Sequence, residues 1–163
     1  LTLLDVQTST EEGIEVLLDD NMEYNIGTKR NKLLERAFGD YVVFIDDDDT
    51  ISINYIKHIL DAIKTTPDCV GMSGIITTDG RKQKNWHISK DYGRWYTSKN
   101  GEYLRTPNHI SPVKRELALQ AMFPEIPYGE DAEYSRRLLP LLKTEVKIRG
   151  TMYHYKYLSN KEK

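Results

Sequence analysis

The residues in this sequence whose types and spacing best suit chemistry are two clusters of aspartates. Asp19-Asp20 follows the apolar run at residues 14–18, and four aspartates at 46–49 follow the apolar run at 41–45. Adjacent carboxylates repel one another, which raises their pKa values unless a cation is bound. Because Mg²⁺ and Mn²⁺ prefer oxygen ligands, the second cluster favours a divalent-metal site over a solvated acidic turn that caps the next helix.

The segments around these clusters predict alternating strands and helices. Strands are expected over residues 14–18, 41–45, 70–77 and 145–148. Helices are expected over 28–38, 53–63, 112–120 and 131–142, with 1–7 as the end of a helix and 79–107 as irregular strands and loops. Uninterrupted apolar strands separated by helices predict an α/β fold with a mostly parallel sheet flanked by helices. Ligands bind outside the carboxyl ends of such strands, so both acidic clusters would converge on one crevice.

The composition narrows the class of protein. The 163 residues include 23 Lys+Arg and 25 Asp+Glu, a net charge of −2, and 39% are hydrophobic. This length predicts a single domain over residues 1–163. No apolar run approaches the ~20 residues that span a membrane, and the first residues lack the layout of a signal peptide. The single cysteine, Cys69, excludes an internal disulfide. Together these features favour a cytoplasmic globular protein.

The charge is unevenly distributed along the chain. Nine basic and two acidic residues give the segment 81–115 a local charge of +7, which leaves −9 for the remainder. Aromatic residues are interleaved with these charges at Trp86, Tyr92, Trp95, Tyr96 and Tyr103. Aromatic rings stack on sugars or bases, and Lys and Arg bind phosphates. The segment therefore predicts a surface for an anionic partner, with a solvated loop face as the alternative.

Four motifs now show a family resemblance. Residues 14–21 end a strand with Asp-Asp, residues 27–31 open a helix with Arg-Asn, and residues 39–49 run from Gly-Asp-Tyr into the aspartates. Residues 128–131, Tyr-Gly-Glu-Asp, precede another helix. In this order the motifs resemble the family 2 glycosyltransferases, whose fold is the Rossmann-like GT-A fold, over residues 14 to about 139. The sequence departs from the family pattern because the usual first strand is missing.

The resemblance assigns the nucleotide-sugar donor and its metal to residues 1–78. It implies that Asp19 or Asp20 contacts the nucleotide base and that Lys29 and Arg30 approach the nucleotide. It also implies that Asp46, with Asp47 beside it, faces the ribose or the metal, and that Asp48 binds Mn²⁺ or Mg²⁺ at the diphosphate. His154 is a further candidate metal ligand, with a polar role in the tail as its alternative.

The resemblance assigns the acceptor and the catalytic base to residues 79–163. It implies that Asp131 takes the proton of the acceptor hydroxyl and that Glu130 positions the acceptor. A helix N-cap is the structural alternative for Asp131. His109 and Trp95 are candidates to line the acceptor site.

These features predict a metal-dependent, inverting glycosyltransferase that uses a nucleoside-diphosphate sugar, with a UDP-sugar as the first choice. The cation would stabilise the charge on the leaving phosphate, and the carboxylate would activate the acceptor hydroxyl. The expected acceptor is a glycan, a lipid-linked sugar or another anionic molecule, and nucleic acid stays open. Two other functions also stay open: a non-catalytic module that binds nucleotide or glycan, and a nucleotidyltransferase that releases pyrophosphate.

Overall fold

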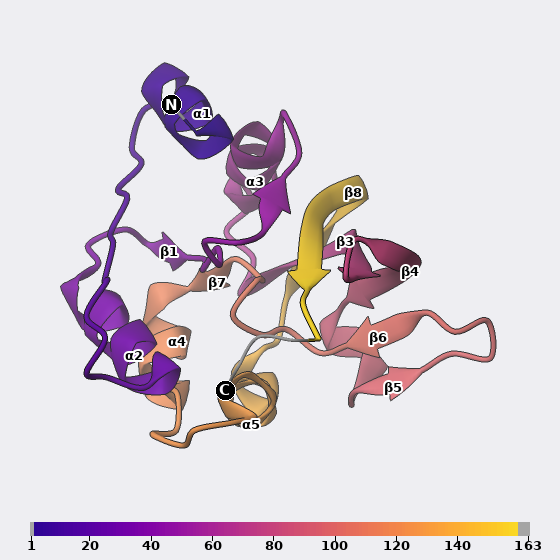
Figure 1. Ribbon diagram of the computed structural model, residues 1–163. Coiled ribbons are helices and arrows are strands. Elements are labelled where there is room, and N and C mark those ends of the chain that lie inside the picture. The colour runs from indigo at the N-terminus through magenta and orange to yellow at the C-terminus, as the bar shows by residue number, and fades with distance from the viewer. Residues whose placement is uncertain (1, 160–163) are drawn as a thin grey trace.

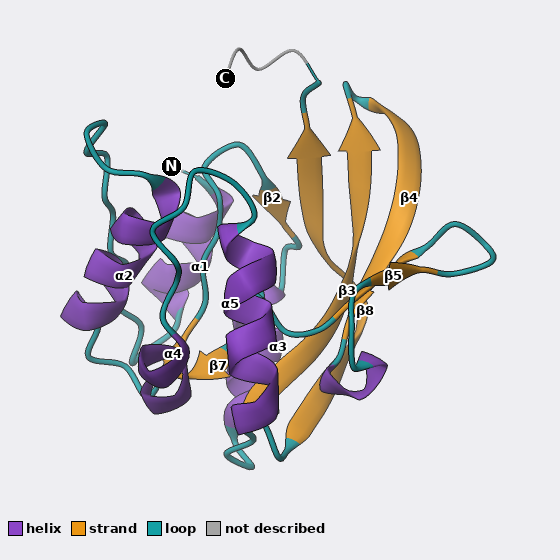
Figure 2. Ribbon diagram, turned by 90° about the horizontal axis from the view of Figure 1, so that it is seen from below, coloured by secondary structure: helices purple, strands orange, loops and turns teal. Residues whose placement is uncertain are grey.

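The computed structural model describes residues 2–159 and arranges them as a mixed β-sheet with helices beside it (Figure 1). The helices are α1 (Leu3–Thr10), α2 (Ile26–Arg36), α3 (Tyr55–Ile63), α4 (Arg115–Ala121) and α5 (Glu130–Leu138), with short 3₁₀ turns at Lys90–Tyr92 and Leu139–Leu141. The strands are β1 (Tyr41–Val42), β2 (Thr50–Ile51), β3 (Cys69–Thr78), β4 (Arg81–Ile88), β5 (Tyr96–Thr97), β6 (Tyr103–Arg105), β7 (Val113–Lys114) and β8 (Glu145–Tyr157). Figure 2 shows the long strands β3, β4 and β8 on one side and helices α2, α4 and α5 on the other.

The α/β fold predicted from the sequence is confirmed, but the sheet is mixed rather than mostly parallel. Strand β3 pairs in parallel with β8 and antiparallel with β4, and β4 pairs in parallel with β6. The antiparallel contribution comes from residues 79–107, for which the sequence predicts irregular structure. Asp79 and Gly80 both have positive φ, 51° and 70°. Such a pair forms a tight hairpin turn, so β4 folds back along β3.

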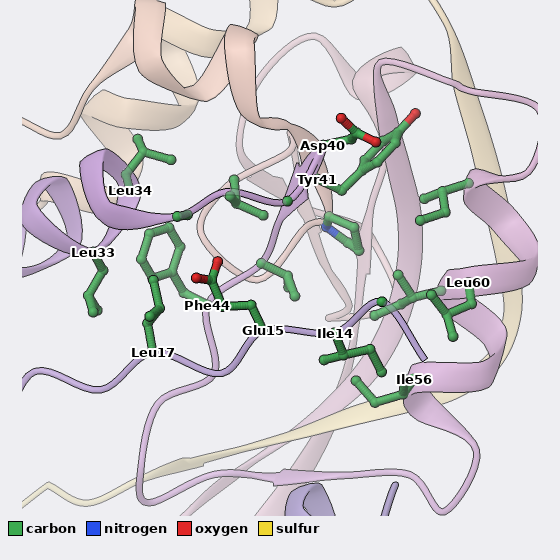
Figure 3. Close-up of a pocket in the computed structure, with 18 of the residues that line it drawn as sticks. Ile14, Glu15, Leu17, Leu33, Leu34, Asp40, Tyr41, Phe44, Ile56 and Leu60 are labelled. Carbon is green, nitrogen blue, oxygen red and sulfur yellow. The ribbon is translucent and has the colours of Figure 1, made fainter. Parts of the chain in front are cut away.

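The strand predicted at residues 14–18 is not formed. This segment makes no backbone hydrogen bond to another part of the described chain, and Val16 and Leu18 are 48% and 80% exposed. It runs past a largely apolar cavity of about 390 Å³, with Ile14 and Leu17 on one side and Phe44 and Leu60 among the other lining residues (Figure 3). A strand needs a hydrogen-bonded neighbour, and here the cavity separates this segment from β1.

Other boundaries also differ from the predicted ones. Helix α1 begins at Leu3 with a capping box that Thr2 and Asp5 form, and it extends past the predicted end at residue 7 to Thr10; Leu1 lies outside the described residues. Strand β1 covers only Tyr41–Val42, and the helix expected from residue 112 starts at Arg115, after β7. The last strand, expected over 145–148, continues to Tyr157 because it pairs with β3 along most of its length.

Two hydrophobic cores position the site. The first lies between α3 and the sheet, since α3 buries one face at helical spacing. Its buried members are Ile51, Tyr55, Ile56, Ile59, Met72, Trp86, Ile88, Ile110, Met152 and Tyr153. The second joins α2, α4 and α5 to β7, and its buried members are Leu34, Cys69, Val113, Ala118, Ala121, Phe123, Tyr134, Leu138 and Leu142. Among residues 2–159, no helix combines the length and apolar character needed to cross a membrane.

Candidate active site

Arg30 connects the aspartate cluster to the Glu-Asp motif. Its guanidinium donates to Asp46 through Nη2 and to Glu130 through Nη1, each at 2.9 Å. The rings of Phe44 and Phe123 lie 5.9 and 5.5 Å from the guanidinium carbon. Arg30, which is expected to approach the nucleotide, is only 4% exposed and forms a buried brace between the two motifs. The Glu130 carboxylate, which is expected to position the acceptor, is bound to this brace.

Asn31, the second residue of the Arg-Asn motif, holds α2 against the segment after α4. Its side-chain amide donates to the carbonyl of Phe123 at 2.9 Å, and its side-chain oxygen accepts from the Phe123 N–H at 2.8 Å. A β-carbon at Gly27 would lie 2.2 Å from the carbonyl oxygen of Pro124, so only glycine allows this approach. The motif therefore fixes the position of Arg30, a function that sequence reasoning missed for Asn31.

Asp46 is held by two basic side chains. Besides Arg30, the ring of His109 approaches it, with Nε2 at 3.4 Å from Oδ2, and both ring nitrogens of His109 are buried without another hydrogen-bond partner in the described chain. Burial disfavours the charged form of Asp46, but His109 and Arg30 outweigh burial and hold its pKa well below the ordinary value. His109 is 6% exposed and packs beside Asp46, so the structure does not place it on an open acceptor surface.

Asp49 ties the aspartate turn to β8. Its carboxylate accepts a 2.7 Å hydrogen bond from the Tyr153 hydroxyl and a 2.8 Å bond from the Lys156 N–H. The same hydroxyl accepts from the Asp46 N–H at 3.2 Å. Burial raises the pKa of Asp49, and the two hydrogen bonds oppose that rise only in part. Asp46 and Asp49 thus shape the turn, and Tyr153 is a residue of the site that sequence reasoning missed.

The fit of a divalent cation depends on Asp47 and Asp48. Asp47 is exposed and Asp48 is half-buried, and both offer the hard oxygen ligands that Mg²⁺ and Mn²⁺ prefer. Among residues 2–159, no three His, Cys, Asp or Glu side chains form a group that could hold a metal ion. This arrangement fits a cation bound by one or two carboxylates and by the phosphates of a substrate, which is the usual mode for Mg²⁺.

The structure does not bring His154 into such a group. Its Nε2 lies 2.8 Å from the hydroxyl of Thr77 on β3. Successive side chains of a strand point to opposite faces, so His154 lies on the face of β8 opposite to Tyr153, which carries the hydroxyl bound to Asp49. Three further residues are predicted to contact the nucleotide. Asp19 accepts from the Asn21 N–H at 3.0 Å, while Asp20 is exposed and Lys29 is half-buried.

Asp131 lies in the first turn of α5, beside Glu130. It is not the N-cap, because Gly129 occupies that position with a φ of 78°. Asp131 is half-buried, and its Oδ1 accepts from the Ala132 N–H at 2.8 Å. Burial raises the pKa of Tyr155 to about 12, and the charges of Asp46, Asp49, Asp131 and Asp48 add to this rise. Tyr155 therefore feels the charges of both acidic motifs, and sequence reasoning missed this residue too.

Trp95 connects the basic and aromatic segment to α5. Its indole N–H lies 3.1 Å from the hydroxyls of both Thr106 and Ser135. Ser135 follows Asp131 by four residues, so the two share one face of the helix. The Arg105 guanidinium stacks on the Trp95 ring at 5.0 Å. The predicted acceptor residue Trp95 thus lies along the same helix face as Asp131.

Comparisons with known proteins bear on the family and the fold of the chain. A family model described as Glycosyl transferase family 2 matches residues 3–124. The Succinoglycan biosynthesis protein ExoM of Rhizobium meliloti (strain 1021) is 29% identical over 68 residues, which are 42% of this chain and 22% of ExoM.

Solved structures of S. aureus TarS share the fold. The complex of TarS residues 1–349 with UDP-GlcNAc superimposes with a TM-score of 0.64 and 19% identity, over 94% of this chain and 45% of TarS. The complex with UDP gives the same TM-score and covers 47% of TarS. The chain therefore spans less than half the length of ExoM and of this TarS fragment. Because the family model covers most of the described chain, the chain belongs to glycosyl transferase family 2.

Proposed function

We propose that this chain carries the catalytic centre of an inverting glycosyltransferase. The enzyme would transfer a sugar from a nucleoside-diphosphate sugar, of the UDP-sugar class, to a hydroxyl of an anionic acceptor. The observation that carries this proposal is the Arg30 brace, whose two 2.9 Å hydrogen bonds join the aspartate turn to the start of α5. It would hold the diphosphate site and the base in a fixed relation to each other.

The donor would lie over the aspartate turn. Asp47 and Asp48 would hold a Mn²⁺ or Mg²⁺ ion together with the diphosphate, and Asp19, Asp20 and Lys29 would contact the nucleotide. When bound, the cation supplies positive charge that stabilises the leaving diphosphate. Support for the UDP class comes from TarS, a protein of the same fold that binds UDP-GlcNAc and UDP.

The chemistry follows from the side chain of Asp131. Its carboxylate would accept the proton of the acceptor hydroxyl while the acceptor oxygen attacks the anomeric carbon. The bond from that carbon to the diphosphate oxygen breaks, and its electron pair leaves with the nucleoside diphosphate. Because the oxygen attacks from the face opposite to the leaving group, the anomeric configuration inverts. Arg30 would keep Glu130, and with it the first turn of α5, in register with the aspartate turn.

The test measures donor binding and transfer separately in Asp131→Asn. We expect affinity for UDP in the presence of Mn²⁺ to stay within about threefold, and release of UDP from UDP-sugars with acceptor to fall by about 10²-fold or more. Glu133→Gln is the matched control, since this carboxylate lies on the same helix but pairs with Arg136 and Arg137 at 2.7 and 3.0 Å. Transfer by Asp131→Asn at the rate of the control would exclude Asp131 as the base.

The products distinguish the two other functions. Release of pyrophosphate in place of nucleoside diphosphate would identify a nucleotidyltransferase. Tight binding of UDP-sugars with no release of either product would identify a binding module. Both outcomes contradict the proposed transfer reaction.

A further inference from the structure

Arg105 is a half-buried arginine whose charge is not paired with a carboxylate among residues 2–159. Its Nη1 donates to the backbone carbonyls of Tyr96 and Leu104, at 2.9 and 3.1 Å. No Asp or Glu oxygen of the described chain lies within 4.0 Å of it. The other arginines near the site differ: Arg30 pairs with two carboxylates, and Arg136 pairs with Glu133.

The guanidinium of Arg105 packs against two aromatic rings. Its carbon lies 5.0 Å from the centre of the Trp95 ring and 4.8 Å from that of Tyr103. Burial lowers the pKa of Arg105, which is the electrostatic cost of holding this cation away from water. Its Nε and Nη2 donors have no hydrogen-bond partner in the described chain. A stacked guanidinium with free, pre-oriented donors matches the geometry of a phosphate or carboxylate group.

The position of this cation adjoins the proposed base. The charge of Asp131 acts on Arg105, and the Trp95 ring that supports Arg105 is hydrogen-bonded to Ser135, one helical turn after Asp131. On the other side, the Lys84 ammonium lies 5.0 Å from the centre of the Tyr103 ring. Cations and rings therefore alternate from α5 across β6 to β4, in the order Trp95, Arg105, Tyr103 and Lys84.

We propose that this row, the Arg105 subsite, binds an oxyanion on the acceptor, so that the substrate class is a glycan bearing phosphate or carboxylate groups. The inference rests on the proposed function and names its acceptor. The rings would contact the sugar, Arg105 would bind the oxyanion in a bidentate manner, and Lys84 would attract the next negative charge along the acceptor. The oxyanion bound there would place a neighbouring hydroxyl near Asp131.

The test measures binding without catalysis. Affinities of glucose 6-phosphate, glucuronate and glucose are measured by calorimetry for the wild-type chain and for Arg105→Gln and Arg105→Lys. We expect one or both anions to bind at least tenfold more tightly than glucose, and Arg105→Gln to abolish that preference. Arg105→Lys keeps the positive charge but loses the planar pair of N–H donors of the guanidinium, so it should keep only part of the preference for anions. Thermal unfolding of each variant shows whether the fold is retained.

Arg136→Gln is the control, because Arg136 is an exposed arginine of α5 that is already paired with Glu133. It should leave the three affinities unchanged. A phosphate preference identifies a phosphate-bearing acceptor and a glucuronate preference a carboxylated one. Equal affinity for all three sugars, or an anion preference that survives in a folded Arg105→Gln, would overturn the subsite. Because these measurements need no transfer, an Arg105-dependent preference without UDP release would contradict only the proposed reaction.

Discussion

Arg30 and Glu130 are separated by one hundred positions in the sequence, and their side chains meet at 2.9 Å. This contact spans the two halves of the chain that the motifs assign to donor and acceptor. The same guanidinium also donates a hydrogen bond to Asp46, at 2.9 Å. The geometry of the proposed centre therefore depends on one buried guanidinium.

Arg30→Met should destabilise the fold by about 3–5 kcal/mol. The substitution removes the buried guanidinium that neutralises two half-buried carboxylates, Asp46 and Glu130, and breaking a buried ion pair from one side costs about this much. Chemical denaturation gives the free energy of unfolding. Arg36→Met, an exposed position on the same helix, is the control and should change it by less than about 0.5 kcal/mol. Equal effects of the two substitutions would contradict the role of Arg30 as a brace.

Asp68 should make stability depend on pH in the acid range. Its carboxylate accepts from the N–H groups of Lys143 and Thr144 and from the Lys114 ammonium, and these contacts outweigh burial to lower its pKa to about 2 from 3.8. Because the pKa is lower in the folded state, the stabilisation is complete above about pH 4 and is lost as the pH falls through about 2. We expect Asp68→Asn to cost about 1–2 kcal/mol at neutral pH and less than about 0.5 kcal/mol near pH 2, where the carboxyl is half protonated.

The measurement is the free energy of unfolding of wild type and Asp68→Asn between pH 7 and pH 2. Asp20→Asn serves as the control, since Asp20 is exposed. The difference between wild type and Asp68→Asn should shrink as the pH falls. A difference that stays constant over this range would mean that the contacts of Asp68 do not depend on its charge.

Gly74→Ala should destabilise the sheet by about 1–3 kcal/mol. A β-carbon there would lie 2.2 Å from both the Trp86 ring and the Tyr153 carbonyl oxygen. These residues are in the first core, so the strain would also move the Tyr153 hydroxyl away from Asp49. Thermal unfolding measures the loss, and Gly39→Ala, whose new β-carbon meets one backbone atom at 3.3 Å, should cost less. Equal melting temperatures for wild type and Gly74→Ala would refute the close packing.

Local patterns in the sequence were sufficient to predict the motifs but not their partners. The aspartate run and the Tyr-Gly-Glu-Asp motif are contiguous, so their places at the start of a turn and of α5 follow from neighbouring residues. The burial of Arg30 depends on Phe44, Phe123 and Glu130, which are distant in sequence and contact it only in the folded chain.

Two features that sequence reasoning missed had a readable signal. Asp-Gly is a dipeptide favoured in two-residue hairpin turns, so Asp79-Gly80 after the predicted strand at 70–77 would have predicted that the chain folds back as β4. The alternation Tyr153-His154-Tyr155 indicates a strand with tyrosines on one face, and the Tyr153 hydroxyl on that face donates to Asp49. No local signal showed that residues 14–18 would not form a strand, because their apolar composition is typical of one. Only the absence of a hydrogen-bonded neighbour keeps this segment from being a strand.

Binding of UDP should require a divalent cation and Asp48. If Asp47 and Asp48 hold the ion together with the diphosphate, chelation of Mn²⁺ by EDTA should weaken UDP binding at least tenfold. The reason is that the carboxylates and the diphosphate would then bind the ion only jointly. Asp48→Asn should weaken Mn²⁺-dependent binding by a similar factor, while Asp61→Asn should not, since Asp61 is exposed on α3 and pairs with Lys64 at 2.6 Å. Calorimetric titration of UDP with and without Mn²⁺ measures both effects. Tight UDP binding that is indifferent to EDTA and to Asp48→Asn would show that the aspartate turn has no cation-dependent role in donor binding.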